Sequence, residues 1–259
     1  MKIVTLVENT SICEDLESEH GLSLYIECND LRILFDMGQS DKFIANAENL
    51  GVDLSMVDFA VISHGHYDHG GGLEAFLKVN NKAKIYMSEH AFEEHYNKEE
   101  KYIGLDVGLM KNNRIVFIKE KVELSNEITL YTSSSVKKFH NIGAFGLKKK
   151  EGGKFLQDDF CHEIYLEIVN SGKRVLFSGC SHGGIIDIMD SFSPDILIGG
   201  FHFFKIEDKE LLQKYAKHLS RFDTDYYTCH CTGELQYEYM KKYVHRLSYI
   251  ASGSVTYLG

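Results

Sequence analysis

The stretch that decides the fold is Phe59-Ala60-Val61-Ile62-Ser63-His64-Gly65-His66-Tyr67-Asp68-His69-Gly70. It opens with a short apolar run, which predicts a buried strand over residues 59–62. Three imidazoles and one carboxylate follow between His64 and His69. Neutral imidazole nitrogen and carboxylate oxygen suit zinc, and also iron or manganese. Without a ligand, four such side chains packed beside an apolar strand would have nothing to compensate their burial. The stretch therefore predicts a divalent metal site where the strand ends.

The backbone of this stretch suggests how the ligands divide. If the chain stays extended after the strand, His64, His66 and Asp68 point the same way, because side chains alternate in such a segment, and His69 faces another direction. Two neighbouring metal sites would then share the loop. The alternative, hydrogen-bonded surface histidines, leaves the clustering unexplained.

The whole-chain composition limits the class of protein. The 259 residues suffice for one α/β domain, and no apolar run approaches the length needed to span a bilayer. A net charge of −10 argues against a nucleic-acid backbone as partner. The short basic run Lys148-Lys149-Lys150 is expected to be a solvated loop. The N-terminus lacks a cleavage pattern, so we expect a cytoplasmic protein with reduced cysteines.

Local patterns predict strands and helices along the chain. Strands are expected at 2–7, 23–28, 31–35, 59–62, 84–87, 164–169, 174–177, 195–198 and 226–228, and helices at 40–50, 73–77, 185–189, 208–221 and 234–244. Asn29-Asp30 suits a tight hairpin, and Ser88 is expected to begin a further helix that reaches about Tyr96. Residues 97–113 and 133–160 show the least regular pattern. Hairpins first and strand-helix alternation later predict sheets covered by helices.

The motif H-x-H-x-D-H at His64–His69 resembles the hallmark of the metallo-β-lactamase superfamily. Leu34-Phe35-Asp36-Met37-Gly38 is similar to an early strand of that superfamily, and Ser178-Gly179-Cys180 is similar to a later one. The resemblance implies a mixed α/β fold, a four-layer αββα sandwich of two mixed β-sheets covered by helices. It also implies a single domain over residues 1–259, with insertions near 97–113 and 133–160.

Four further stretches resemble one subgroup, often described only as metal-dependent hydrolases. They are Glu19-His20-Gly21-Leu22-Ser23, Gly179-Cys180-Ser181-His182-Gly183-Gly184-Ile185, Gly199-Gly200-Phe201-His202 and Cys229-His230-Cys231-Thr232-Gly233. The subgroup includes archaeal relatives of a dihydropteroate-synthase-like enzyme. Those relatives join a pterin-methyl diphosphate to a ribofuranosylaminobenzene phosphate.

The resemblance implies how the ligands are shared between two ions, most simply two zinc ions. His64 and His66 would bind the first ion, and Asp68 and His69 the second. The superfamily usually has a histidine before the hairpin that begins near Ile164, where this chain has Asp158, Asp159 and His162. We expect His182 to complete the first site instead, with His162 as the weaker alternative.

The remaining ligands are expected in the second half of the chain. His230 would complete the second site. Cys180 stands where the superfamily commonly has a metal-binding Asp or Cys, although a buried packing residue is the competing interpretation. Cys229 and Cys231 are expected to be packing residues.

Residues beyond the ligands are predicted to support the reaction. Asp36 would orient a metal-bound imidazole by accepting its other N–H. Asp68 would also orient the attacking water, and His202 would act as a proton donor or substrate contact. The other histidines (20, 90, 95, 140, 218 and 245) are expected at the surface or in structural roles, with His20 the exception to watch.

These features predict a metal-dependent hydrolase acting on an ester or phosphoester of a small molecule. The Lys-rich segment 137–154 favours a phosphate-bearing substrate. One alternative is a transferase that joins a pterin-methyl diphosphate to an aminobenzene acceptor, and another is a non-catalytic metal or redox binding module. No membrane partner is expected, and the sequence leaves a homodimer open.

Overall fold

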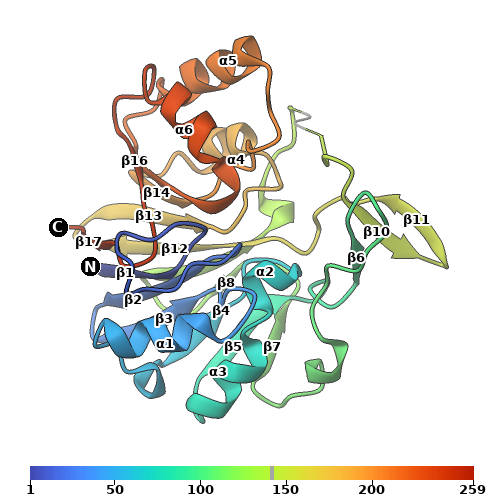
Figure 1. Ribbon diagram of the computed structural model, residues 1–259, viewed down its shortest axis with the longest axis vertical. Helices are drawn as coiled ribbons and strands as arrows, with labels where there is room; N and C mark the ends of the chain where they lie inside the picture. Colours follow the sequence, from blue (N-terminus) through green and yellow to red (C-terminus); the bar gives the residue numbers. More distant parts are fainter. Residues whose placement is uncertain (141–142) are drawn as a thin grey trace.

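The computed structural model describes residues 1–140 and 143–259 (Figure 1). Two large β-sheets pack face to face, and helices cover the outer face of each, which gives the four-layer αββα arrangement expected from the sequence. The N- and C-terminal strands lie side by side, because β1 pairs with β17.

The first sheet carries the N-terminal half of the chain and the C-terminal strand. Its strands, in spatial order, are β17 (Val255–Tyr257), β1 (Lys2–Val7), β2 (Ser23–Cys28), β3 (Leu31–Phe35), β4 (Phe59–Val61), β5 (Lys84–Ser88) and β7 (Ile115–Ile118). Strands β3, β4, β5 and β7 run parallel, whereas β1 and β2 pair antiparallel with their neighbours. The turn between β2 and β3 has positive φ at Asn29 and Asp30, as the hairpin prediction required.

The second sheet carries the C-terminal half. Its strands, in spatial order, are β16 (Leu247–Tyr249), β15 (Asp225–Thr228), β14 (Ile196–Gly199), β13 (Lys173–Ser178), β12 (Ile164–Asn170), β9 (Ile128–Thr132) and β8 (Val122–Glu123). Strands β13 to β16 are parallel. Both sheets are therefore mixed, and each has a block of parallel strands whose carboxyl ends can meet at one edge.

The helices lie outside the two sheets. They are α1 (Lys42–Asn49), α2 (Tyr67–Gly70), α3 (Leu73–Val79), α4 (Ile185–Phe192), α5 (Lys209–Leu219) and α6 (Glu234–Met240). Short 3₁₀ turns occur at η1 (Leu54–Met56), η2 (Val107–Leu109), η3 (Ser133–Ser135) and η4 (His230–Thr232). One apolar cluster fills the space between the two sheets. A second lies between the first sheet and its helices, and a third between the second sheet and its helices.

A third, small sheet differs from the sequence prediction. Its strands are β11 (Lys154–Gln157), β10 (Lys148–Glu151) and β6 (Glu94–Tyr96), and it projects from the sandwich. The expected loop at Lys148–Lys150 is thus a strand, and the helix expected from Ser88 to Tyr96 is wrong. Glu94–Tyr96 is extended because it pairs with β10, a contact between distant segments that the local pattern did not contain.

The structure also bears on membrane insertion. Within residues 1–140 and 143–259, we find no helix that is long and apolar enough to cross a bilayer.

Candidate metal centre

The histidine-rich stretch begins at the carboxyl end of β4 and turns into the short helix α2. His66 still has extended backbone, but Tyr67–Gly70 is helical. The expectation that Asp68 points with His64 and His66, and away from His69, is therefore wrong. Asp68 Oδ2 and His69 Nε2 lie 4.0 Å apart, because one helical turn brings both side chains toward the C-terminal half.

The C-terminal half supplies four more side chains from consecutive parallel strands. Cys180 and His182 follow β13, His202 follows β14, and His230 follows β15. All four are at least nine-tenths buried. The parallel strands thus bring residues separated by many positions to the same edge of the sandwich, where the three predicted ligands and His202 lie near one another.

Four non-glycine residues at this edge have backbone in the left-handed region. Asp36, Ser181, His202 and His230 have φ values of 61°, 55°, 55° and 49°. Non-glycine residues rarely adopt such angles, and they persist where surrounding contacts fix them, often at functional sites.

Two imidazoles approach each other closely through their Nε2 atoms. His69 Nε2 lies 3.2 Å from His230 Nε2. His69 Nδ1 is 2.6 Å from Asp36 Oδ2, and His230 Nδ1 is 2.7 Å from the Asn9 amide oxygen. Both partners are acceptors, so each Nδ1 carries the ring proton and each Nε2 of a neutral ring presents a lone pair.

Opposed lone pairs repel unless a proton or a cation lies between them. Cys180 Sγ is 3.2 Å from His69 Nε2, and Asp68 Oδ2 is 3.3 Å from His230 Nε2. Two ligands about 2.0 Å from a tetrahedral zinc ion lie about 3.3 Å apart. The four side chains therefore have the spacing and the chemistry of a divalent metal site.

A second group surrounds His64. The Ser63 hydroxyl donates to Asp36 Oδ2 at 2.7 Å and accepts from His64 Nδ1 at 2.9 Å. This arrangement leaves His64 Nε2 with a lone pair, buried and without a hydrogen-bond partner among the described residues. Asp36 thus contacts His69 directly and His64 through Ser63, in the orienting role expected from the sequence.

His66, His182 and His202 also present unpartnered nitrogens. In the described part of the chain, His66 Nε2 and both ring nitrogens of His182 and His202 are buried without a hydrogen bond. One ring nitrogen each from His64, His66 and His182 lies within 4.8 Å of the other two. Buried polar atoms left unpaired are costly, so these nitrogens also fit a bound cation.

Electrostatics keeps most of these rings neutral. Burial, together with neighbouring imidazoles, lowers the pKa of His64, His66 and His182 well below the usual value. His69 differs: burial lowers its pKa, but the charges of Asp36 and Asp68 outweigh burial and raise it. Neutral imidazole is the form that ligates metal, so His64, His66 and His182 are in the protonation state that can bind an ion.

The structure distinguishes the two candidates for completing the first site. The Gly65 N–H donates to His162 Nδ1 at 2.8 Å. A neutral His162 therefore carries its proton on Nε2 and has no free lone pair for a metal. His182 has two uncommitted nitrogens, and its ring centroid lies 4.8 Å from that of His64.

His20, the exception to watch among the other histidines, lies at the site together with residues that the sequence did not indicate. His20 Nε2 is 3.2 Å from Asp68 Oδ2, although the His20 side chain is 49% exposed. Cys231 Sγ accepts from the His202 N–H at 3.3 Å and lines the cavity, whereas Cys229 packs in the core between the sheets, as expected. His95 and Asp158 form a buried pair beside His66. The available signals were the subgroup-like stretch around His20 and the carboxylates at 158 and 159.

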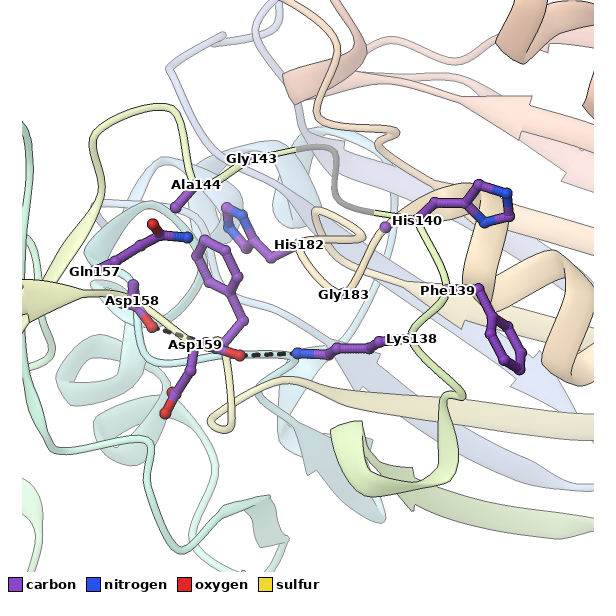
Figure 2. A pocket seen from close by; sticks show the side chains of 12 residues that line it. Lys138, Phe139, His140, Gly143, Ala144, Gln157, Asp158, Asp159, His182 and Gly183 are labelled. Carbon is purple, nitrogen blue, oxygen red and sulfur yellow. Dashed lines mark hydrogen bonds between the residues drawn. The ribbon is translucent and has the colours of Figure 1, made fainter.

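Two cavities adjoin at His182. One, of about 180 Å³, is lined by His20, His66, Asp68, Cys180, His202 and His230, and at its rim by Tyr67, Phe204 and Lys205. The other, of about 340 Å³, is lined by His182 together with Lys138, Asp158 and Asp159 (Figure 2). The first cavity is lined by five of the seven candidate ligands, so it is the candidate reaction site.

Comparisons with known proteins agree with this geometry. The sequence profile of the metallo-beta-lactamase superfamily matches residues 19–229. The 7,8-dihydropterin-6-methyl-4-(beta-D-ribofuranosyl)-aminobenzene-5'-phosphate synthase of Methanocaldococcus jannaschii is 29% identical over 259 aligned positions, which cover 90% of this chain and 88% of that protein. An uncharacterized protein of the same organism is 29% identical over 89% of this chain and 90% of its own length.

Solved structures show the same architecture. The crystal structure of Tm1679, described as a metal-dependent hydrolase of the beta-lactamase superfamily, has a TM-score of 0.84 and 29% identity, covering 100% of this chain and 99% of its own. Zn(2+)-bound PqqB from Methylobacterium extorquens has a TM-score of 0.61 and 11% identity over 100% of both chains, and is similar in fold alone.

Proposed function

The chain belongs to the metallo-beta-lactamase superfamily, and from this premise we propose that it hydrolyses an ester or phosphoester bond of a small molecule in a metal-dependent reaction. Members of this superfamily are commonly metal-dependent hydrolases, and Tm1679 carries that description. The observation that carries the proposal is the 3.2 Å approach of His69 Nε2 to His230 Nε2, because each Nδ1 is committed to an acceptor and the two Nε2 atoms need a cation or a proton between them.

The proposed site holds two divalent ions. The nitrogens of His64, His66 and His182 would hold one ion. Asp68, His69, His230 and Cys180 would hold the other, and this set of nitrogen, oxygen and sulfur atoms suits zinc.

Bound divalent ions supply Lewis acidity, which activates water near neutral pH and offsets developing negative charge. The side chains around them fix orientation and protons. Burial alone would raise the pKa of Asp68, but the charges and hydrogen bonds of His69, His20 and His230 lower it well below its usual value. Asp68 therefore stays ionised and accepts hydrogen bonds at the cavity floor. His20 links the Asp68 carboxylate to solvent, so it gives protons a way out of the site.

His202 is better suited to hydrogen bonding than to acid catalysis. Burial and the charge of Lys205 lower the pKa of His202 to about 3, so its ring is neutral at physiological pH. Both ring nitrogens are buried and unpartnered within the described residues. A neutral imidazole in this position can donate one N–H to a substrate oxygen, which supports the substrate-contact role over that of a charged proton donor.

The cavity rim favours an anionic substrate. Lys205 Nζ lies 5.1 Å over the Phe204 ring, and we find no carboxylate paired with it in the described ranges. Its one polar contact there is the Phe145 carbonyl oxygen, at 3.5 Å. Lys205 is thus a cation available at the mouth of a site in a protein of net charge −10, and it would bind a phosphate or carboxylate group.

Metal content and hydrolysis measured together test the proposal. Purified protein should contain up to two zinc equivalents and hydrolyse at least one member of a panel of phosphodiester, phosphomonoester, lactone and thioester substrates. His69→Ala and His66→Ala should lose both metal and activity, whereas His245→Ala, at an exposed position, should lose neither. Equal activity in wild type and His66→Ala would contradict the proposal. Iron with a visible absorption band and no hydrolysis would favour the redox module.

Group transfer is a second candidate, favoured by the 29% identity to the archaeal synthase over most of both chains. In that reaction an aromatic amine would replace water and a diphosphate would leave. Incubation with a pterin-methyl diphosphate and an aminobenzene acceptor distinguishes the two, because transfer gives coupled product without bulk hydrolysis.

We also propose that the protein acts in the cytoplasm. All six cysteines are unpaired, and two of them, Cys180 and Cys231, line the proposed site. A reducing compartment preserves such thiols.

A further inference from the structure

Four buried ionisable side chains lie beside the proposed centre, and the function proposed above uses only one of them. They are His66, His95, Asp158 and His162, each with at most 4% of its surface exposed. One ligand-type atom from each lies within 4.8 Å of those of the others. Burying four such groups together is costly, so the cluster requires an explanation of its own.

Hydrogen bonds already engage ligand-type atoms of three residues in this cluster, whereas His95 Nε2 and His162 Nε2 have no hydrogen-bond partner among the described residues. His162 Nδ1 accepts the Gly65 N–H, so Nε2 of the neutral ring carries the proton. The Asp158 carboxylate is also occupied. Its Oδ2 accepts from His95 Nδ1 at 2.8 Å, and its Oδ1 accepts the Phe160 N–H at 2.9 Å and lies 3.4 Å from His162 Nε2.

We propose that Asp158 is a positioning residue, which acts through His162 and His95 to fix the loop that carries His64 and His66. The inference rests on the proposed metal centre and extends its machinery to a third segment of the chain.

The first step runs through His162. The Asp158 charge favours a proton on His162 Nε2, because Nε2 lies 3.4 Å from Asp158 Oδ1, close enough for electrostatic attraction although the pair does not form a hydrogen bond. His162 Nδ1 is then left to accept the N–H of Gly65, the residue between the two histidines. A Cβ at Gly65 would overlap the Ala91 carbonyl oxygen, so the peptide is held tightly between Ala91 and His162.

The second step runs through His95. Its Nδ1–H is committed to Asp158, which fixes the plane of the ring. The ring centroid of His95 lies 3.9 Å from that of His162 and 5.5 Å from that of His66, with the His66 ring nearly perpendicular. The His95 ring therefore packs against the His66 ring, and the hydrogen bond to Asp158 fixes the orientation of His95.

The network also gives the small sheet a role. His95 lies on β6, which pairs with β10 at Lys149, and Asp158 directly follows β11 of the same sheet. The Asp158 N–H donates to the Leu147 carbonyl oxygen at 3.1 Å, just before β10. The buried Asp158 carboxylate is thus one of the connections between the projecting sheet and the metal loop, beside the backbone hydrogen bonds of Ile103 to Tyr67 and His95.

Metal affinity, measured by competition with a chromophoric chelator, tests the proposal without relying on activity. Asp158→Asn should weaken binding of one of the two zinc ions about 10- to 100-fold, the range seen when groups that orient ligands are removed. The absorption spectrum of the cobalt-substituted protein should change with it. Asp159→Asn is the matched control: it removes the same charge from the adjacent position, where the side chain is 45% exposed and pairs with Lys149, and it should bind zinc like wild type.

A double-mutant cycle checks that the effect passes through His162. If it does, His162→Ala should weaken zinc binding to a similar extent, and adding Asp158→Asn should cost little more. His162→Ala also keeps the test decisive if Asp158→Asn does not fold, since unchanged affinity in that variant would overturn the proposal.

Other outcomes separate this inference from the proposed function. If wild-type protein binds no divalent ion, the proposed function itself fails. If it binds two ions and Asp158→Asn matches Asp159→Asn, only the positioning role fails. A third equivalent of metal that is lost in His95→Ala would show that the cluster is a metal site, and would also overturn the positioning role.

Discussion

Two buried carboxylates, Asp36 and Asp158, serve the same group of histidines by different routes. Asp36 contacts His69 directly at 2.6 Å and reaches His64 through one hydroxyl, that of Ser63. Asp158 contacts neither, and reaches the loop through His162 and the Gly65 N–H. The difference teaches that Asp36 is hydrogen-bonded to a candidate ligand ring itself, whereas Asp158 reaches the loop only through other histidines, His162 at the backbone and His95 at the His66 ring.

The largest expected effect follows from replacing Asp36. Its two oxygens accept from His69 Nδ1, Ser63 Oγ and the Ser63 N–H, so an amide at this position must direct its NH₂ toward a donor. We expect Asp36→Asn to weaken zinc binding about 100-fold and to lower the free energy of unfolding of the metal-free protein by about 1–3 kcal/mol. Chelator competition and urea unfolding measure the two effects. A smaller loss of zinc affinity than in Asp158→Asn would break the comparison.

Ser63→Ala isolates one arm of the Asp36 network. It removes the hydroxyl between Asp36 and His64 and leaves the contact of Asp36 with His69 intact. Zinc affinity at the His64 site should fall about tenfold, at the lower end of the range for such groups. Ser248→Ala, on an exposed strand position, is the control. If the affinity for both ions falls equally, the contacts of Asp36 with His69 and, through Ser63, with His64 do not act separately.

The pH dependence of stability separates the imidazoles from Asp158. Burial lowers the pKa of His182 well below its usual value. Above about pH 6.5 the ring is neutral in both the folded and the unfolded protein, so its titration does not reduce the free energy of unfolding there. Below that pH the His182 ring is protonated in the unfolded chain but stays neutral in the folded chain. Stability from this source should therefore fall by about 1.4 kcal/mol between pH 7.5 and 5.5.

Urea unfolding of the chelator-treated protein at these two pH values measures the difference. The difference in the free energy of unfolding between the two pH values should be smaller in His182→Ala and unchanged in His245→Ala. Asp158 behaves differently: burial would raise the pKa of its carboxyl, but hydrogen bonds and the charges of His162 and His95 lower it. Its contribution is present above about pH 4 and is lost only at more acidic pH, so Asp158→Asn should leave the loss between pH 7.5 and 5.5 intact. A smaller loss in Asp158→Asn would contradict this separation.

The smallest expected effect lies at the substrate side of the cavity. Lys205→Met should raise KM for a phosphorylated substrate about fivefold, since a partly exposed ion pair contributes about 1 kcal/mol. Zinc affinity should not change, because Lys205 has no contact with either carboxylate network among those described. Lys214→Met is the control. A change in zinc affinity would show that the rim and the metal loop are coupled.

Much of the site could be predicted because its parts are local. The ligands from His64 to His69 are contiguous, Asp36 directly follows β3, and Cys180, His182, His202 and His230 all lie soon after strands that the apolar pattern predicted. The carboxyl ends of parallel strands meet at one edge of a sheet. Most residues of the candidate site therefore lie just after a predicted strand. The orientation of Asp68 and His69 was wrong because one helical turn changes which side chains share a direction.

His95 could not be found in this way. A helix from Ser88 would have placed it among surface residues, and only the pairing of β6 with β10, about fifty positions later in the chain, makes the segment a strand that buries this ring. His162 was considered only as a ligand. Its actual role depends on the Gly65 N–H, which crosses from one half of the chain to the other.

The sequence by itself predicted a divalent metal site at a strand end and sheets covered by helices, because ligand chemistry and strand periodicity are local properties of the chain. The αββα sandwich and the sharing of ligands between two ions were implied by the resemblance to the metallo-β-lactamase superfamily. Only the tertiary structure decided which nitrogens remain free for those ions. A histidine can ligate through a ring nitrogen only when that nitrogen is neither protonated nor already hydrogen-bonded. For His64, His69, His162 and His230, that condition is set by Ser63, Asp36, Gly65 and Asn9, and in most cases the partner is distant in sequence.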